Sequence, residues 1–402
     1  MKKYNNELLS VPGITLNGIY TGVKKSRNDL GIIYTNKGIA AGVFTQNVVK
    51  AAPVVVSEMN IKNETTSAII INSGNANACT GKLGYENAIE TINHVADKLD
   101  IDPKEVLVSS TGLIGKQLEM DKIKKGIAPL IDGINENTYH QFPESITTTD
   151  TYNKTCSCKV ELNGEWITIV GVAKGSGMIH PNMATTLGFI QTDVNISKPA
   201  LQSILSNVIV DTFNMISVDG DTSTNDMVIA LSSCDAKNVL IKENTPEYAK
   251  LKEALLYVTK MLAISVAQDG EGATKLIECT VFNANSDVSA RKMAKSVIQS
   301  SLVKAAVFGK DANWGRIICS LGYSGVSFDP DVIDLNIKSD TGKIALMANG
   351  TGLEFDETEA LKILSDEKVI IEVDVKDGQY EATAWGCDLT YDYVTINAEY
   401  RT

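Results

Sequence analysis

Lys174-Gly175-Ser176-Gly177-Met178-Ile179-His180-Pro181-Asn182-Met183-Ala184-Thr185-Thr186-Leu187-Gly188 places a small residue directly before a hydroxyl side chain, at the end of a turn rich in glycine, proline and asparagine. Attack by the Thr185 hydroxyl on the Ala184 carbonyl would convert this peptide bond into an ester, and hydrolysis would leave Thr185 as a new N-terminus. Such a threonine carries its own base, because a free α-amine has a pKa of about 7.7 to 8.0 and accepts the hydroxyl proton near neutral pH. The local alternative is that Thr185 and Thr186 simply begin a strand.

Strand-like and helical stretches surround this segment without regular alternation. Runs rich in β-branched residues predict strands at 30–34, 39–44, 54–56, 68–71, 106–108, 167–172, 227–231, 276–282, 316–320 and 369–375. Apolar residues spaced three and four apart predict helices over 88–99, 201–209, 251–262 and 293–306. Many strands with a few long amphipathic helices indicate an α/β (α+β) fold, a layered sandwich of stacked sheets covered by helices.

Composition and charge limit the classes of partner. The chain has 402 residues, and its 37 basic and 49 acidic residues give a formal net charge of −12. Such a chain offers no basic face for a phosphate backbone or an anionic membrane. The sequence has no run of about 18 apolar residues that could span a bilayer, and its basic start has no apolar h-region behind it. We therefore expect a cytoplasmic protein whose partners are neither nucleic acids nor membranes.

Metal and disulfide chemistry are not expected. The seven cysteines are odd in number and scattered, which indicates reduced thiols. Cys156 and Cys158 are close in sequence, but no second cysteine or histidine pair lies nearby, so packing in a strand is favoured over zinc. The aspartate-rich segment 217–226 lacks the ligand spacing of an EF-hand. None of the three histidines follows the pattern of a Ser-His-Asp triad.

Other short motifs contain groups suited to acyl chemistry. Thr111 and Gly112 follow an apolar strand, and a hydroxyl donor beside a glycine that permits close approach is a candidate oxyanion hole. The asparagine-rich segment 72–81 either wraps a site or forms a plain loop. Lys174 could bind a carboxylate, although most lysines are solvated, and Glu271 is either a turn carboxylate or a counter-ion for an amine.

Taken together, these motifs resemble the ornithine acetyltransferase family, the bifunctional glutamate N-acetyltransferases of arginine biosynthesis. The resemblance covers nearly the whole chain and is carried by residues 42–47, 51–54, 72–81, 110–112, 148–151, 174–178, 183–185, 269–275, 309–316 and 397–402. So many matches in order are far more specific than any single motif. One departure is Thr186, because the family commonly has methionine after the nucleophile.

The resemblance implies a layered αββα-type fold that is similar to the N-terminal nucleophile hydrolases but topologically distinct from them. It implies cleavage between Ala184 and Thr185 into an α chain, 1–184, and a β chain, 185–402. The two chains would stay associated as a heterotetramer with two copies of each. The polar stretch before a predicted helix additionally suggests a smaller C-terminal sub-domain, 286–402.

The resemblance also implies an activity. The acetyl group of N2-acetyl-L-ornithine would pass to L-glutamate by ping-pong catalysis through an ester on the nucleophile Thr185, with Thr111 and Gly112 as the oxyanion hole. The residues implied to bind substrate are Thr148, Lys174, Thr185, Glu271, Asn397 and Thr402. No metal or organic cofactor is expected, and acetyl-CoA is left open as a second acetyl donor. A self-processing aminopeptidase or amidase and an uncleaved small-molecule binding protein are the alternatives.

Overall fold

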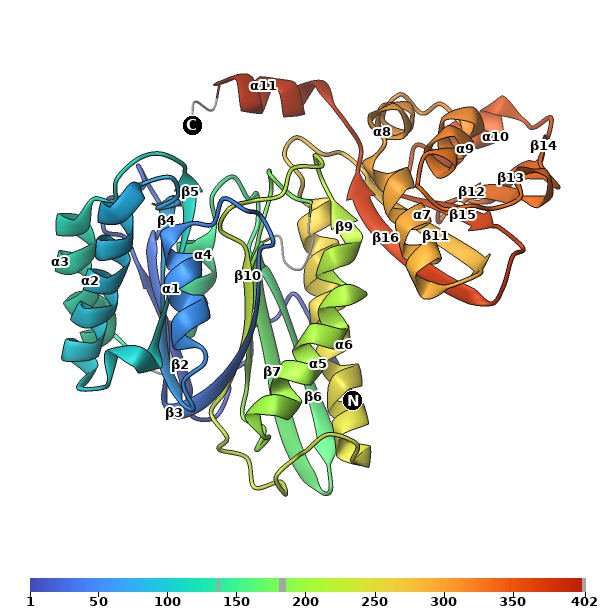
Figure 1. Cartoon of the computed structure of the whole chain (residues 1–402). Coiled ribbons are helices and arrows are strands. Elements are labelled where there is room, and N and C mark those ends of the chain that lie inside the picture. Colours follow the sequence, from blue (N-terminus) through green and yellow to red (C-terminus); the bar gives the residue numbers. More distant parts are fainter. Residues whose placement is uncertain (136–137, 181–185, 400–402) are drawn as a thin grey trace.

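Strand β3 (Leu30–Phe44) connects the two halves of the largest sheet in the computed structural model of the protein, which describes residues 1–135, 138–180 and 186–399 (Figure 1). Its first half pairs with β2 (Ile14–Ile19) and β4 (Thr66–Asn75), and its second half pairs with β10 (Met227–Ser232). The pairing register with β4 shifts between Tyr34 and Gly38. The one strand therefore belongs to both halves of the sheet.

Within the described residues this sheet has nine strands in the order β1-β6-β7-β8-β10-β3-β4-β5, with β2 beside β3. The strands not yet placed are β1 (Lys2–Asn5), β5 (Val106–Leu113), β6 (Lys154–Leu162), β7 (Glu165–Lys174) and β8 (Leu187–Thr192). Strand β8 is antiparallel to β7 and parallel to β10. The start of β8 consequently lies between the end of β7 and the start of β10.

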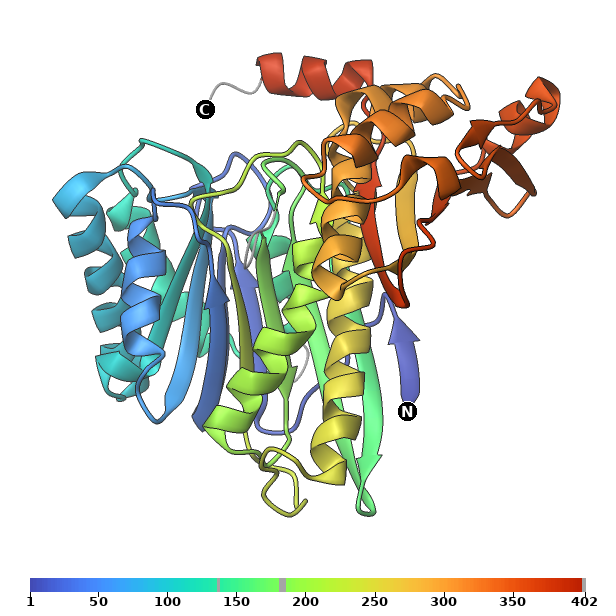
Figure 2. The same ribbon diagram turned by 45° about the vertical axis from the view of Figure 1, so that its right-hand side comes forward.

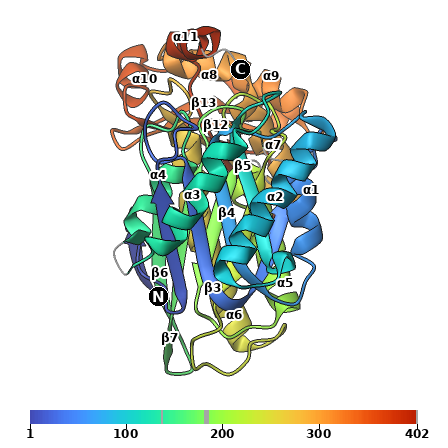
Figure 3. The same cartoon turned by 90° about the vertical axis from the view of Figure 1, so that its left-hand side faces the viewer.

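The two halves of the sheet enclose a common core. Ile33, Ile69 and Leu107 from one half and Phe189 and Ile229 from the other belong to one buried apolar cluster. Helices α5 (Lys198–Val210) and α6 (Pro246–Gln268) cover the outer face of the β6–β10 half, whereas α2 (Gly81–Leu99) and α3 (Met120–Asp132) cover the outer face of the β3–β5 half (Figures 1 and 3). This helix–sheet–sheet–helix order confirms the predicted layered fold.

A second sheet lies beyond one end of the sandwich (Figure 2). In the described part of the chain it has seven strands in the order β14-β13-β12-β15-β11-β16-β9, with bounds β9 Ile216–Ser217, β11 Leu276–Ala284, β12 Asp334–Lys338, β13 Lys343–Ala348, β14 Thr351–Gly352, β15 Lys368–Asp374 and β16 Tyr380–Cys387. The remaining helices are α1 Ala52–Asn60, α4 Phe142–Ile146, α7 Asp287–Gln299, α8 Ser301–Phe308, α9 Trp314–Gly322, α10 Glu357–Ile363, α11 Tyr391–Glu399 and the short 3-10 helices Pro103–Glu105, Thr138–Gln141, Phe213–Met215 and Pro330–Val332.

Two predicted strands are wrong. Residues 54–56 lie in α1 and residues 316–320 lie in α9. Pro53 in the first turn of α1 presets a helical backbone, and the Asn313 side chain caps α9 by accepting a hydrogen bond from the Arg316 backbone N–H. These local start signals outweigh the β-branched residues that follow them.

The other predicted strands and helices are confirmed with small changes at their ends. The helix predicted over 293–306 is divided into α7 and α8 at Ser300, whose extended backbone ends one helix and whose side chain caps the next. Ser286 caps α7 at the start of the predicted sub-domain, but that sub-domain and the division before Thr185 stay predictions. Among the described helices, none is long and apolar enough to cross a membrane.

Candidate active site

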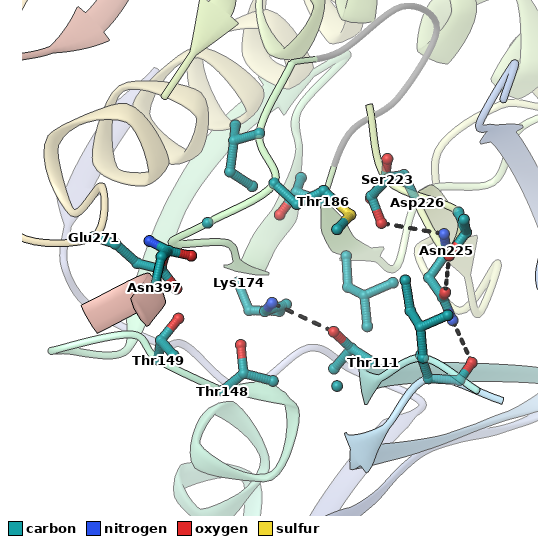
Figure 4. A pocket seen from close by; sticks show the side chains of 18 residues that line it. Thr111, Thr148, Thr149, Lys174, Thr186, Ser223, Asn225, Asp226, Glu271 and Asn397 are labelled. Carbon is teal, nitrogen blue, oxygen red and sulfur yellow. Dashed lines mark hydrogen bonds between the residues drawn. The ribbon is translucent and has the colours of Figure 1, made fainter. Parts of the chain in front are cut away.

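One pocket at the start of β8 is lined by every predicted site residue that the structure describes (Figure 4). These residues come from β5, the loop after α4, the end of β7, the turn after α6, and α11, and they are Thr111, Gly112, Thr148, Lys174, Glu271 and Asn397. Thr186 and Leu187 also line the pocket. The other predicted residues, Ala184, Thr185 and Thr402, lie outside the described residues.

Lys174 ends β7 with its side chain in the pocket and is only 7% exposed. Its Nζ donates a hydrogen bond of 3.4 Å to Oγ1 of Thr111, which comes from the other half of the sheet. Burial lowers the pKa of Lys174, and the nearby carboxyls of Asp150, Asp226 and Glu271 oppose this shift. Because the Thr111 oxygen accepts from Lys174, its own O–H can donate to an oxygen atom in the pocket.

Position 112 requires glycine, because the backbone of the neighbouring strand β4 lies directly against it. Its φ is +132°, and a Cβ at this position would lie 2.3 Å from the carbonyl carbon of Gly74 and 2.5 Å from the backbone nitrogen of Asn75. No side chain fits at that distance. The sequence predicted that this glycine permits close approach, and the structure shows close approach by strand β4.

Glu271 occupies a space that Gly177 leaves free. The Glu271 backbone N–H donates to the carbonyl of Ser176 at 3.0 Å, and Nδ2 of Asn397 donates to Oε2 of Glu271 at 2.9 Å. A Cβ on Gly177 would lie 2.4 to 2.7 Å from the Glu271 carboxyl atoms. Gly177 therefore leaves room for the carboxylate of Glu271, which is distant in the sequence.

A buried ion network holds the loops around the pocket together. Lys154 Nζ lies 2.6 Å from Oδ1 of Asp150 and 2.6 Å from Oδ2 of Asp269. Asp150 also accepts hydrogen bonds from the backbone N–H groups of Thr148, at 2.9 Å, and Gly175, at 3.0 Å. Burial raises the pKa of the Asp150 carboxyl, but the neighbouring ammonium and N–H groups overcome this effect and lower the pKa to about 2. The network thus connects the loops that carry Thr148, Lys174 and Glu271.

Sequence reasoning missed the contribution of segment 217–226, which it compared only with a calcium loop. Nδ2 of Asn225 donates to the backbone carbonyls of Ala76, at 2.6 Å, and Ser110, at 2.8 Å, so the segment forms a wall of the pocket. Asp226 is buried in this wall, and its burial raises its pKa well above the ordinary value. The high density of aspartate, asparagine and hydroxyl residues was the available signal.

Segment 72–81 has mainly a structural role. Its asparagine side chains donate to backbone carbonyls: Asn72 to Asn75 at 2.9 Å, Asn75 to Gln117 at 3.0 Å and Asn77 to Gly84 at 2.8 Å. Ala76 is the member of this fully described segment that lines the pocket. Asn72 and Asn75 lie in β4 and not in a loop, and the asparagine side chains hold the end of this strand and the turn before α2 in place.

We predict that Lys154→Met strongly destabilises the protein. The substitution leaves two buried carboxylates without their cation, and breaking a buried ion pair costs about 3 to 5 kcal/mol. Lys82→Met is a matched control, because Lys82 and its partner Glu86 are 90% and 52% exposed and such pairs contribute about 0.5 kcal/mol or less. Urea unfolding measures both changes in free energy. Equal losses in the two variants would contradict a stabilising role for the network.

Known proteins are similar to this chain over nearly its whole length. The model of the ArgJ family matches residues 15–402. The chain is 49% identical over 400 residues to arginine biosynthesis bifunctional protein ArgJ 1 of Clostridium acetobutylicum, covering 99% of this chain and 98% of that protein. It is 50% identical over 394 residues to arginine biosynthesis bifunctional protein ArgJ of Thermotoga neapolitana, covering 97% and 99%.

A solved structure is also similar. The crystal structure of arginine biosynthesis bifunctional protein argJ from Bacillus halodurans matches with 46% identity and a TM-score of 0.51. The match covers 98% of the solved chain but 53% of this chain. The solved chain is accordingly about half as long as the protein described above.

Proposed function

Because the chain belongs to the ArgJ family, we propose that it is an acetyltransferase of arginine biosynthesis that passes the acetyl group of N2-acetyl-L-ornithine to L-glutamate. The observation that carries this proposal is the pocket at the start of β8. Six residues expected to serve acyl transfer line it together, although they come from distant parts of the chain. Thr186, which follows the expected nucleophile Thr185, lines the same pocket.

The first chemical step is cleavage of the chain itself. Thr185 Oγ1 attacks the carbonyl of Ala184, and water hydrolyses the resulting ester, so that residues 1–184 and 185–402 become separate chains. The half-length Bacillus halodurans chain supports this step, because a cut near the middle produces chains of that size. The two chains would remain associated, and we propose two copies of each in the assembly.

Acetyl transfer then follows in two half-reactions. The Thr185 oxygen attacks the acetyl carbonyl, its α-amine takes the hydroxyl proton, and the Thr111 hydroxyl and Gly112 N–H stabilise the oxyanion. Collapse breaks the amide bond, the proton moves to the departing ornithine nitrogen, and an acetyl ester remains. The glutamate amine attacks this ester, N-acetylglutamate leaves, and the Thr185 hydroxyl is restored.

The charged groups of the pocket fit the two amino acids. Both substrates carry an α-carboxylate, and Lys174 is the buried cation available to bind it. Glu271, held by Asn397, is suited to the ammonium group of the ornithine side chain. The reaction as written uses no metal or organic cofactor, because the acetyl group arrives on an amide nitrogen. We propose acetyl-CoA as a second acetyl donor. The proposed location of the protein is the cytoplasm.

An amidase that releases the acetyl group to water is the competing function. Both reactions share the first half, so the acceptor in the second half distinguishes them. We expect N-acetylglutamate to form in step with ornithine when glutamate is present, with little free acetate. Acetate release equal to ornithine release would favour the amidase.

We predict that Thr185→Ala gives one uncleaved, inactive chain, whereas Thr186→Val is cleaved and active. The first change removes the nucleophile and the second removes only the neighbouring hydroxyl while keeping the shape of the side chain. Intact mass of the denatured protein locates the cut, and an assay of acetylglutamate formation measures transfer. Robust transfer by Thr185→Ala, or an uncleaved Thr186→Val chain, would disprove the assignment of Thr185.

We predict that Gly177→Ala lowers kcat/KM for acetylornithine by about 100-fold, because the new methyl group displaces Glu271 and small misplacements carry costs of that size. Gly322→Ala is the control, since an added Cβ there meets no atom within 4 Å. Steady-state assays compare the two variants, and equal melting temperatures show that both are folded. An unchanged kcat/KM in Gly177→Ala would remove Glu271 from the substrate site.

A further inference from the structure

Asp226 is a buried carboxyl of the pocket that has no role in the reaction as written above. It directly precedes β10, is 3% exposed and lines the pocket together with Lys174 and Thr111 (Figure 4). The Met227 N–H donates to the Thr186 carbonyl at 3.1 Å, which fixes Asp226 beside the start of β8. Burial of a carboxyl opposes folding unless the group is fully hydrogen-bonded, so its partners are decisive.

The two oxygens of the Asp226 carboxyl have different surroundings. The Ser223 hydroxyl and the backbone N–H groups of Ser223 and Thr186 donate to the carboxyl, yet Oδ2 is buried without a partner among the described residues. These donors therefore engage Oδ1. Burial raises the pKa of the carboxyl well above its ordinary value, against the opposing effect of Lys174, and so favours the protonated form. Because the lone pairs of Oδ1 accept hydrogen bonds, the proton lies on Oδ2.

This O–H group has no acceptor in the described part of the protein. The Thr186 hydroxyl does not accept from it, because that oxygen is also buried without a partner. Buried donors are almost always satisfied, so a donor left over in a pocket indicates an acceptor that arrives with a ligand. The proposed substrates bring an α-carboxylate and an acetyl oxygen. The α-carboxylate already has Lys174 as its partner, which leaves the acetyl oxygen.

The neighbours of Asp226 also favour the acetyl oxygen. Its carboxyl accepts from the N–H of Thr186, the residue that follows the expected nucleophile, so the carbonyl under attack is expected close to this carboxyl. Asn225 donates to the Ser110 carbonyl at 2.8 Å and thereby joins the segment to the end of β5 that carries Thr111. Asp226 and Thr111 therefore border the place where negative charge develops during acyl transfer.

We propose that Asp226 is a third oxyanion donor, whose Oδ2–H group donates a hydrogen bond to the acetyl oxygen beside Thr111 and Gly112. This inference rests on the proposed function. The proton stays on Asp226, and the hydrogen bond strengthens as the carbonyl becomes an oxyanion, so it lowers the barrier of both half-reactions. A protonated aspartate donates to an oxyanion in the same way in ketosteroid isomerase.

Asp226→Asn and Asp226→Leu distinguish a donor from a carboxylate. In the asparagine variant the amide oxygen keeps the Oδ1 position, and the NH₂ group is a weaker donor where the O–H group was, so we expect kcat to fall by about tenfold or less. The leucine variant has no donor, and loss of one oxyanion donor lowers kcat by about 100-fold to 1000-fold. Equal losses would show that the carboxylate is needed and would overturn the inference. Wild-type kcat in the leucine variant would overturn it too, since a water molecule could then satisfy Oδ2.

The pH profile of kcat is a second readout, which does not depend on the leucine variant. The donor is lost as rising pH ionises Asp226, whereas an amide does not ionise, so kcat of Asp226→Asn should persist to higher pH than kcat of the wild type. Lys174 and Glu271 are the other ionisable groups among the described pocket residues, and the variant keeps both. The bound α-carboxylate holds Lys174 in its charged form. Alkaline limbs at the same pH in the two proteins would overturn the inference.

Asp193→Leu is the matched control. Asp193 follows the opposite end of β8, accepts a 2.9 Å hydrogen bond from the Thr168 N–H, and also has a pKa raised by burial, but it does not line the pocket. The substitution removes a buried carboxyl in the same way, so it reports the cost to stability alone, and we expect wild-type kcat. A loss of kcat as large as that of Asp226→Leu would assign the effect to folding and overturn the inference.

Intact mass separates this inference from the proposed function. Wild-type protein that is uncleaved, or that transfers no acetyl group, would refute the proposed function and this inference with it. Cleaved, active wild-type protein beside an Asp226→Asn chain as impaired as the leucine variant would refute the inference alone. An uncleaved but folded Asp226→Asn chain would also overturn it, because the amide supplies a donor at the same position. If the leucine variant is itself uncleaved or unfolded, kcat and the pH profile of Asp226→Asn decide.

Discussion

The ammonium group of Lys154 lies between two carboxylates in a part of the protein that water does not reach. Lys154 and Asp150 have fully buried side chains, and Asp269 is 4% exposed. Charges in such a place are tolerated only when they are paired and hydrogen-bonded. The backbone N–H groups of Thr148 and Gly175 provide the additional donors. Any movement of one of these loops would leave a charge uncompensated, and the pocket therefore keeps its shape.

The site also depends on the stacking of the two halves of the main sheet. Thr111 comes from β5 and Lys174 from β7, and their contact crosses the interface between the halves. Asn225 strengthens the same interface, since its side chain from the β10 side donates to the carbonyl of Ser110 at 2.8 Å. Thr111 and Lys174 are accordingly brought together by closure of the apolar core. A site built across rigid strands holds its geometry better than one built on loops alone.

The sequence predicted the layers and most elements because apolar periodicity reflects which face of a strand or helix is buried. It failed at 54–56 and 316–320, where short helices contain β-branched residues and a local start signal, Pro53 in α1 and the Asn313 cap in α9, decides the outcome. Thr111, Gly112, Lys174 and Glu271 were candidates from their local motifs, whereas Thr148 and Asn397 were identified only through family resemblance. Asp226 was not identified, because an aspartate in a polar segment looks the same whether it is exposed or buried. Burial of that kind is a property of the tertiary structure.

Lys174 and Asp226 both oppose folding, which argues that their chemistry is the reason for their burial. Burial raises the pKa of Asp226 above its ordinary 3.8, so the folded state loses stability as the pH rises from that value toward the folded pKa. Burial lowers the pKa of Lys174 below 10.5, so its cost is relieved only as the pH rises through the window below 10.5. At neutral pH the fold bears a cost at both positions. Local features that oppose stability without structural benefit are expected at functional sites, and the two strand ends beside β8 fit that expectation.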